Sequence, residues 1–294
     1  MSDQRTQGGN ASAAATLVVS CPDRTGIVAS LGQLLYGEGA NITQSDQFSD
    51  LRSGMFFQRI CFDLPEAGAS LDPVRSAISN FADEFDMGWA LHTADEIPRV
   101  AIMVSRFDHC LYDLLLRHRS GELACQISLV VSNHPDLEEI AGHFSVPFHV
   151  FPITNSNRDE QEAKQRELFE DTGIDLIVLA RYMQILSADF ISCYESRIIN
   201  IHHSFLPAFV GAKPYQQAYE RGVKLIGATA HYATEELDQG PIIAQGVAPI
   251  SHQDRVEDLA RRGRDIERMV LGDAVRLHLE RRVLVHGNKT VVFG

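Results

Sequence analysis

Apolar and polar positions follow two different rhythms along the chain, and the change falls near residue 95. In the first part, short apolar stretches typical of strands alternate with helical patterns. We expect strands over residues 16–20, 41–48, 55–64 and 87–92, and helices over 27–37 and 72–85. The order βαββαβ predicts a small α/β domain over residues 14–93. Residues 1–13 are polar and small, and we expect a disordered lead-in there.

From Arg99 onward, buried-looking strands alternate with helices. Strands are expected over residues 100–105, 125–132, 147–153, 174–180 and 197–201, and helices over 110–117, 136–144 and 159–172. This alternation is typical of a doubly wound, mostly parallel sheet.

The remainder of this second part extends the sheet and then becomes helical. Antiparallel strands are expected over residues 226–233 and 242–247, a long charged helix or helix pair over 254–283, and a short strand over 291–293. The acidic stretch 94–98 ends in Pro98 and is the expected linker. The second domain therefore spans residues 99–294, and the whole chain belongs to the α/β class.

Polar side chains follow one of the buried strands in an arrangement suited to carbonyl chemistry. Asn200 and His202 are two residues apart, so they share one face of the strand 197–201 as it ends. Asp238 lies in the loop after the next expected strand, and this loop can carry it back toward Asn200 and His202. An amide N–H stabilises an oxyanion, an imidazole transfers a proton, and a carboxylate holds the imidazole or accepts a proton from water.

Such a trio needs no covalent nucleophile, which favours direct attack by water or an amine on an acyl carbon. Ser204 keeps a covalent route open. A metal site is a further alternative, because imidazoles and a carboxylate suit zinc or iron. Its ligands would be His202, His203, His231 and Asp238.

Four short motifs carry a family resemblance that extends over residues 177–245. They are Asn200-x-His202, Ser204-x-Leu206-Pro207, Gly227-x-Thr229-x-His231 and Asp238-x-Gly240-Pro241-Ile242-Ile243. Together they resemble the superfamily of 10-formyltetrahydrofolate hydrolases and formyltransferases. The resemblance implies a formyltransferase-like fold, a folate substrate, no cofactor and no metal. It also implies that Asn200, His202 and Asp238 are the catalytic residues.

The resemblance assigns supporting roles around this trio. It places the pterin beside segment 179–186, where Arg181, Met183 and Leu186 are the candidate contacts. Ordinary core packing is the alternative for some of these side chains. The loop 234–238 is expected to cover the other side of the pterin. The remaining supporting candidates are His203, which positions water or fills the pocket wall, Ser204, Thr229, His231 and Gly240.

The loop after the first strand of the second domain separates two activities within the superfamily. It reads Ser105-Arg106-Phe107-Asp108-His109-Cys110 and contains no glycine. A phosphate cradle at a helix N-terminus usually needs small residues, and relatives that formylate a ribonucleotide are Gly- or Ser-rich there. Hydrolysis of 10-formyltetrahydrofolate to formate and tetrahydrofolate is therefore expected, supplying formate to purine and one-carbon metabolism. A formyltransferase acting on an amine is the alternative, and a non-catalytic folate or amino-acid sensor is a second one.

The first domain resembles an ACT domain through Cys-Pro-Asp-Arg-x-Gly-Ile-Val at residues 21–28. The resemblance implies that Asp23, Gly26 and Asn41 bind a small amino-acid effector and that chains pair into a homo-oligomer, a dimer or a tetramer. The competing interpretation is structural. Gly26 relaxes the turn, Asp23 caps the helix, and Asn41 tolerates a left-handed backbone.

Composition narrows the partners. The length of 294 residues suits two domains. The formal net charge of −13 argues against nucleic acid or an anionic membrane surface as a partner. The longest apolar runs, such as residues 176–180, are strand-sized, and residues 1–10 are too polar for a secretory signal. The five cysteines are scattered and lack metal-ligand spacing, so reduced thiols and a cytoplasmic location are expected.

Overall fold

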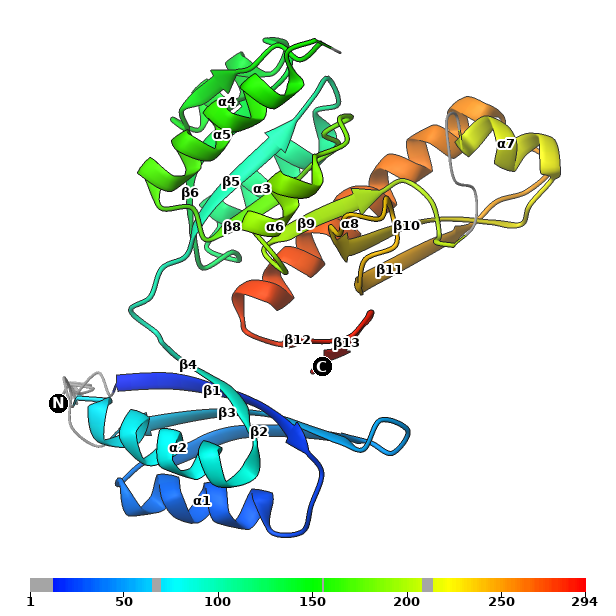
Figure 1. Ribbon diagram of the computed structural model, residues 1–294. Helices are drawn as coiled ribbons and strands as arrows, with labels where there is room; N and C mark the ends of the chain where they lie inside the picture. The colour runs from blue at the N-terminus through cyan, green and yellow to red at the C-terminus, as the bar shows by residue number, and fades with distance from the viewer. Residues whose placement is uncertain (1–12, 65–69, 155, 208–213) are drawn as a thin grey trace, which may run out of the picture. The chain divides into compact units, whose positions relative to one another are not determined.

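The structure, a computed structural model, describes residues 13–64, 70–154, 156–207 and 214–294 (Figure 1). Most of the expected lead-in lies outside the described residues, and Ala13, its last residue, is the first residue of a strand. The chain divides into two compact units, residues 1–96 with 293–294 and residues 97–292. None of the described helices combines the length and the apolar composition that a bilayer crossing requires.

Unit 1 is a four-stranded antiparallel sheet with two helices on one face (Figure 1). Its elements are β1 (Ala13–Pro22), α1 (Ile27–Gly37), β2 (Asn41–Asp50), β3 (Met55–Leu64), α2 (Asp72–Phe85) and β4 (Gly88–Thr93). The strand order is β2-β3-β1-β4. Leu17 and Val19 are two residues apart on β1 and therefore share the face that the helices cover. They pack there with Leu31 of α1 and Ile78 of α2. The predicted βαββαβ domain is confirmed.

The turn from β1 into α1 depends on a glycine. Gly26 has φ 100° at the position that precedes the helix, a left-handed conformation that side chains with a Cβ rarely adopt. Ile27, Leu31 and Leu35 then repeat at helical spacing and are buried against the sheet.

Unit 2 contains a seven-stranded sheet of order β11-β10-β9-β8-β5-β6-β7. Its strands are β5 (Arg99–Val104), β6 (Gln126–Ser132), β7 (Phe148–Val150), β8 (Leu176–Leu179), β9 (Ile198–His202), β10 (Leu225–Tyr232) and β11 (Ile242–Pro249). Strands β5 to β9 are parallel, and β10 and β11 run antiparallel to their neighbours. The described helices are α3 (His109–Arg119), α4 (Glu138–His143), α5 (Arg158–Thr172), α6 (Ala188–Cys193), α7 (Pro214–Arg221) and α8 (Val256–Leu279).

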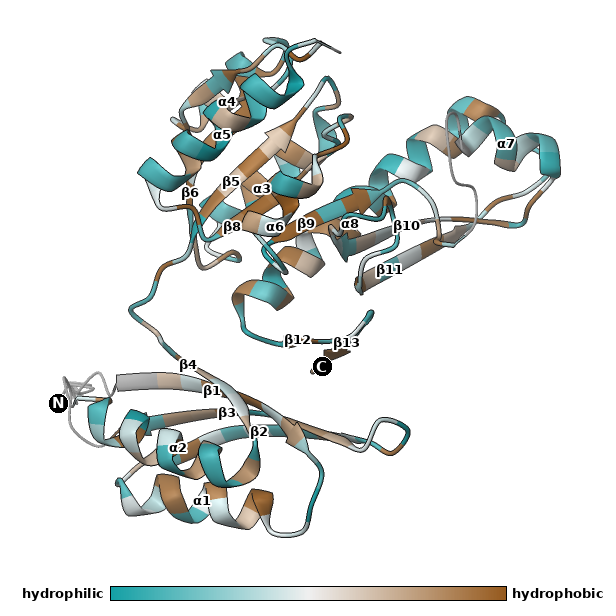
Figure 2. Ribbon diagram, viewed as in Figure 1, coloured by the Kyte–Doolittle hydropathy of each residue, from teal (hydrophilic) through white to brown (hydrophobic). Residues whose placement is uncertain are grey.

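Alternation along β5 gives this sheet two apolar faces. Val100, Ile102 and Val104 enter a core shared with α3, α4 and α8, whereas Ala101 and Met103 enter a core shared with α5 and α6. Figure 2 shows β5 hydrophobic over most of its length and the helices hydrophobic on part of their surface. The predicted doubly wound α/β domain is confirmed, because helices cover both faces of a mostly parallel sheet.

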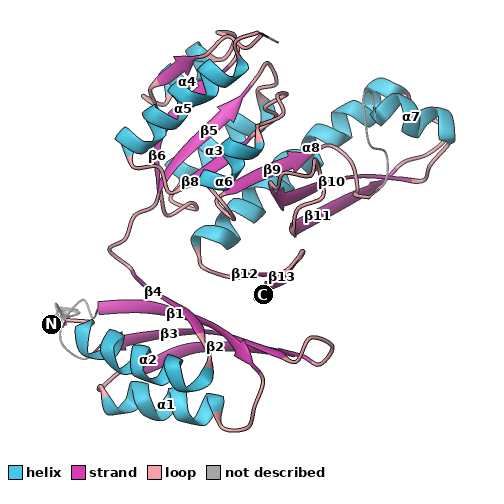
Figure 3. Cartoon of the chain, in the orientation of Figure 1, coloured by secondary structure: helices cyan, strands magenta, loops and turns pink. Residues whose placement is uncertain are grey.

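The C-terminal end differs from the expectation drawn from the sequence (Figure 3). The long helix expected to residue 283 ends at Leu279, and a hairpin of β12 (Val283–His286) and β13 (Lys289–Val292) replaces the single expected strand. Positive φ values at Arg281 and Gly287 explain the change, because the first leaves the helical conformation and the second forms the hairpin turn. The short helices α6 and α7 were not predicted either.

Candidate functional site

The candidate site lies at the carboxyl ends of β5, β8 and β9. Strand β5 has β6 on one side and β8 on the other, so the winding of the sheet reverses between β5 and β8. Open α/β sheets bind ligands at such a reversal, outside the carboxyl ends of the strands. A cavity of about 650 Å³ opens there, within the size range of small-molecule sites.

The three candidate catalytic side chains converge in this cavity. Asn200 and His202 stand at the end of β9, and Asp238 comes from the loop between β10 and β11. His202 Nδ1 lies 3.2 Å from Asp238 Oδ2, and both side chains are largely buried. The predicted return of Asp238 toward β9 is therefore present in the structure.

His231 joins the trio from the neighbouring strand. Asn200 and His231 are directly opposed in the β9 and β10 pair, and Asn200 Nδ2 lies 3.2 Å from His231 Nε2. His231 Nδ1–H donates to the Tyr232 carbonyl at 2.9 Å, so Nε2 is the acceptor in the neutral ring. His231 Nε2 also lies 3.7 Å from Asp238 Oδ1. His231 thus orients the Asn200 amide and leaves its second N–H for a ligand.

The cavity contains a charged carboxylate, Asp238, and a neutral imidazole, His203. Burial raises the pKa of Asp238, but the hydrogen bond with His202 opposes this effect, and the pKa lies below its usual range. Burial, reinforced by Arg181 and His202, lowers the pKa of His203 to about 4. Asp238 is therefore ionised and His203 is neutral near pH 7. The His203 ring stacks on His202 with centroids 5.1 Å apart, and it lines the same cavity.

The loop that carries Asp238 is held in a tight conformation. Asp238 has φ 58°, and Gly240 lies so close to β10 that an added Cβ would meet the Tyr232 carbonyl oxygen at 1.8 Å. Only glycine fits this approach. Gly240 is not among the residues that line the cavity, so its position supports the loop rather than a ligand.

Thr229 and Ser204 support the segment that follows β9. The Thr229 hydroxyl donates to the Ser204 carbonyl at 3.0 Å and accepts from the Leu206 N–H at 3.1 Å. Both residues are buried, and neither lines the cavity that holds the trio. Ser204 is therefore not placed to attack a ligand bound there.

The loop after β8, where the pterin contacts were expected, forms one wall of the cavity. Arg181, Met183 and Leu186 all line the cavity, and Arg181 turns the chain with φ 64°. The Met183 N–H donates to Ser105 Oγ at 3.0 Å, and that hydroxyl donates to Asn133 Oδ1 at 2.6 Å. Ser105, at the end of β5, was not predicted as a site residue. It ties the loop after β8 to the strand on the other side of the sheet reversal.

A buried carboxylate in another wall of the cavity was also missed. Glu267 of α8 is 1% exposed and accepts hydrogen bonds from Tyr215 at 2.6 Å and from His109 at 2.8 Å. Arg181 Nε lies 3.5 Å from the same carboxylate. A signal was present in the sequence, because Glu267 interrupts the apolar stripe of α8. The unexpected lining residues here are Phe107, His109, Tyr215, Ala260, Arg264 and Glu267.

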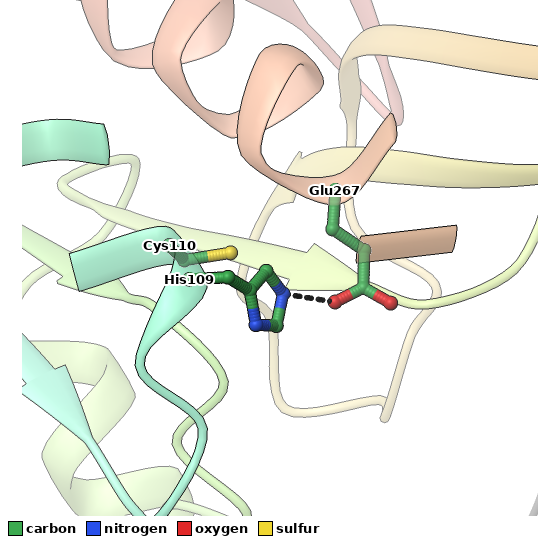
Figure 4. Close-up of side chains that lie close together, drawn as sticks. All are labelled: His109, Cys110 and Glu267. Atoms are coloured by element: carbon green, nitrogen blue, oxygen red, sulfur yellow. Dashed lines mark hydrogen bonds and ion pairs between the residues drawn. The ribbon is translucent and has the colours of Figure 1, made fainter. Parts of the chain in front are cut away.

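His109, Cys110 and Glu267 have the spacing of a metal site, with ligand atoms within 4.8 Å of one another (Figure 4). Two neighbouring effects oppose a metal there. The Arg181 guanidinium competes for the carboxylate, and burial raises the pKa of the Cys110 thiol well above its usual value. Among the described residues, no such group forms from the metal ligands that the sequence suggested, which were His202, His203, His231 and Asp238.

The candidate effector residues of unit 1 are only partly brought together. Asp23 and Gly26 belong to the turn after β1, and the Asp23 N–H donates to the Gly54 carbonyl at 2.8 Å. Asn41 begins β2 and pairs with Asp63, which places it at the opposite end of the sheet. Within one unit, Asn41 therefore does not share a site with the other two.

Comparison with known proteins assigns both units. Residues 98–275 match the model of the formyl transferase family, and residues 15–69 match that of the ACT domain. A formyltetrahydrofolate deformylase of Synechocystis sp. is 53% identical, with 95% of this chain and 98% of that protein covered. A solved formyltetrahydrofolate deformylase of Pseudomonas syringae pv. tomato has a TM-score of 0.94 at 47% identity, covering 98% of this chain and 96% of that one.

A more distant structure matches a smaller share of the chain. The glycinamide ribonucleotide transformylase 1 of Symbiobacterium toebii has a TM-score of 0.65 at 30% identity, covering 70% of this chain and 98% of that one. The near-complete matches include the ACT domain, whereas this match does not extend over the whole chain. The chain belongs to the formyltetrahydrofolate deformylase family.

Proposed function

We propose that this protein hydrolyses 10-formyltetrahydrofolate to formate and tetrahydrofolate. The observation that carries the proposal is the convergence of Asn200, His202 and Asp238 in one cavity at the sheet reversal. The deformylase relatives named above, which match nearly the whole chain, support the same reaction. The acceptor-free reaction also fits the loop after β5, where Phe107 and His109 stand without glycine.

The mechanism begins with the formyl carbon placed beside Asn200. Asp238 and His202 act as a pair, and the ionised carboxylate orients a water and shares its proton with the imidazole. The water oxygen bonds to the formyl carbon, and the carbonyl oxygen becomes an oxyanion. The Asn200 N–H that His231 leaves free stabilises this oxyanion together with His202.

Collapse of the tetrahedral intermediate completes the reaction. The bond from the formyl carbon to N10 breaks, and N10 gains a proton that the water released, through His202 or a relayed water. Formate and tetrahydrofolate leave. No residue becomes covalently modified, in keeping with the position of Ser204 outside the cavity. We propose that neither a metal nor a cofactor takes part.

The decisive experiment follows formate and tetrahydrofolate together in chelator-treated protein without any amine. Equal amounts of both products, with turnover reduced about 10²- to 10⁴-fold in Asp238→Asn, support a metal-independent hydrolase. The exposed Asp265→Asn on α8 is the matched control and should keep wild-type turnover. Turnover that begins only when an amine or a metal is added would refute the proposal.

Wider roles follow from unit 1 and from composition. We propose that the ACT domain binds a small amino-acid effector and that the chain forms a homo-oligomer, a dimer or a tetramer. Strand β2 is an edge of its sheet, and a second copy can pair with such an edge. We further propose a cytoplasmic location, supported by five free cysteines, and a supply of formate to purine biosynthesis. Light scattering with and without glycine or methionine tests both the assembly and the effector.

A further inference from the structure

The polar wall around Glu267 is not used by the hydrolysis mechanism, yet it lines the same cavity. We call His109, Arg181, Tyr215 and Glu267 the Glu267 network. Its members come from α3, the loop after β8, α7 and α8. Four separate elements therefore converge on one carboxylate.

Both oxygens of this carboxylate have partners inside the protein. Oε1 accepts from the Tyr215 hydroxyl, and Oε2 accepts from His109 and faces Arg181. Burial raises the pKa of Glu267, but His109, Arg181 and Tyr215 outweigh it, and the pKa lies below its usual value. The group is thus an ionised, internally satisfied carboxylate, which resists rearrangement when a ligand approaches.

The network borders the reacting centre through His203. The His203 ring stacks on His202 on one side and lies 6.5 Å from the Tyr215 ring on the other. Phe107 closes the same region, with the Arg181 guanidinium 4.6 Å from its ring centroid. Side chains that contact one another therefore form the wall of the cavity beyond His203.

Gly263 makes room for this arrangement. It lies one turn before Glu267 on α8, and an added Cβ would stand 1.9 Å from the Tyr215 hydroxyl oxygen. Tyr215 reaches Glu267 because this position of the helix has no side chain. The glycine on α8 and the tyrosine on α7 therefore both contribute to the single contact between Tyr215 and Glu267.

Water and an amine complete the same reaction at the formyl carbon. In either case the nucleophile forms a bond to that carbon, the bond to N10 breaks, and N10 receives the proton that the nucleophile loses. The choice between them is therefore a matter of access, because an amine with a substituent needs space that water does not. The transformylase of Symbiobacterium toebii, which has a related fold, is named after such an acceptor, glycinamide ribonucleotide.

We infer that the Glu267 network is the specificity determinant that reserves the formyl carbon for water by filling the acceptor side of the cavity. The inference rests on the proposed hydrolysis. It assigns His109, Tyr215 and Glu267 as positioning residues that hold the wall and do not take part in proton transfer. Breaking the network should admit an amine.

The test is a partition experiment with glycinamide at pH 8 as the amine. Full-length enzyme is given 10-formyltetrahydrofolate, and N-formylglycinamide and formate are quantified together by mass spectrometry, with the uncatalysed transfer subtracted. Glu267→Gln breaks the network, and His109→Ala opens it without changing α8. The ratio of the two products does not depend on how much protein is correctly folded, because both come from the same active molecules.

We expect the ratio of N-formylglycinamide to formate to rise at least about tenfold in both variants. Glu257→Gln on the exposed start of α8 and His143→Ala on α4 are matched controls and should keep the wild-type ratio. A wild-type ratio in both Glu267→Gln and His109→Ala would overturn the inference while leaving hydrolysis standing. Wild-type enzyme that releases no formate without amine would instead refute the proposed hydrolysis.

Discussion

Asn200 and His231 face each other across β9 and β10, and the Asn200 amide donates a hydrogen bond to His231 Nε2 at 3.2 Å. The Tyr232 carbonyl fixes the proton of His231 on Nδ1, so this contact sets which way the amide points. The orientation of the proposed oxyanion donor is therefore decided by a residue on another strand.

This contact predicts different effects for two replacements of His231. His231→Phe removes the acceptor, and we expect kcat for formate release to fall about 10- to 100-fold. His231→Gln retains an acceptor oxygen and should lose less. Steady-state kinetics with both variants measures the difference. Equal rates would show that the acceptor does not orient Asn200.

Asn200→Asp tests the oxyanion role directly. The change keeps the size of the side chain, but it removes a donor and places a negative charge beside the developing oxyanion. We expect kcat to fall about 10²- to 10³-fold, and to fall further than in Asn200→Ala, which removes the donor without adding charge. Near-wild-type turnover, or an Asp variant faster than the Ala variant, would contradict the role.

The neutral state of His203 predicts a dependence of stability on pH. Its pKa is about 4 in the folded chain, against 6.5 for the ordinary group, so the unfolded chain binds a proton between these values and the folded chain does not. Stability therefore falls as pH drops from 6.5 to 4. After allowance for partial exposure, the wild type should lose about 2 kcal/mol more than His203→Gln over this range.

Urea unfolding of both proteins at pH 7, 5.5 and 4.5 measures this difference. The glutamine does not titrate, so its variant reports all other groups together. Stability curves that run parallel for the two proteins would show that His203 is not held neutral.

Ser105 is expected to affect binding more than chemistry. Its hydroxyl joins the Met183 N–H to Asn133 and touches none of the trio. Losing one positioning hydrogen bond costs about 1 kcal/mol, so Ser105→Ala should raise KM about fivefold and change kcat little. Ser128→Ala on β6, outside the cavity, is the control and should leave KM unchanged. A fall in kcat at constant KM would place Ser105 in the chemical step instead.

Local pattern was sufficient for the parts of this protein that depend on neighbouring residues along the chain. Strand alternation and helical spacing predicted both domains, and the expected helix 72–85 coincides with α2. Period two along 197–201 placed Asn200 and His202 on one face of β9. The hairpin of β12 and β13 was missed because the charged helical pattern of the sequence continues past Leu279. The chain instead leaves the helical conformation at Arg281 and turns at Gly287, and both residues have positive φ.

Contacts between distant residues decided what remained. The pairing of Asn200 with His231 follows from the register of β9 against β10, and the burial of Glu267 follows from how α8 packs beside α3 and α7. A glutamate within a helix is charged and exposed by default. Only the arrival of Tyr215, His109 and Arg181 from other elements makes its burial tolerable, because a buried carboxylate needs partners that short-range sequence does not supply.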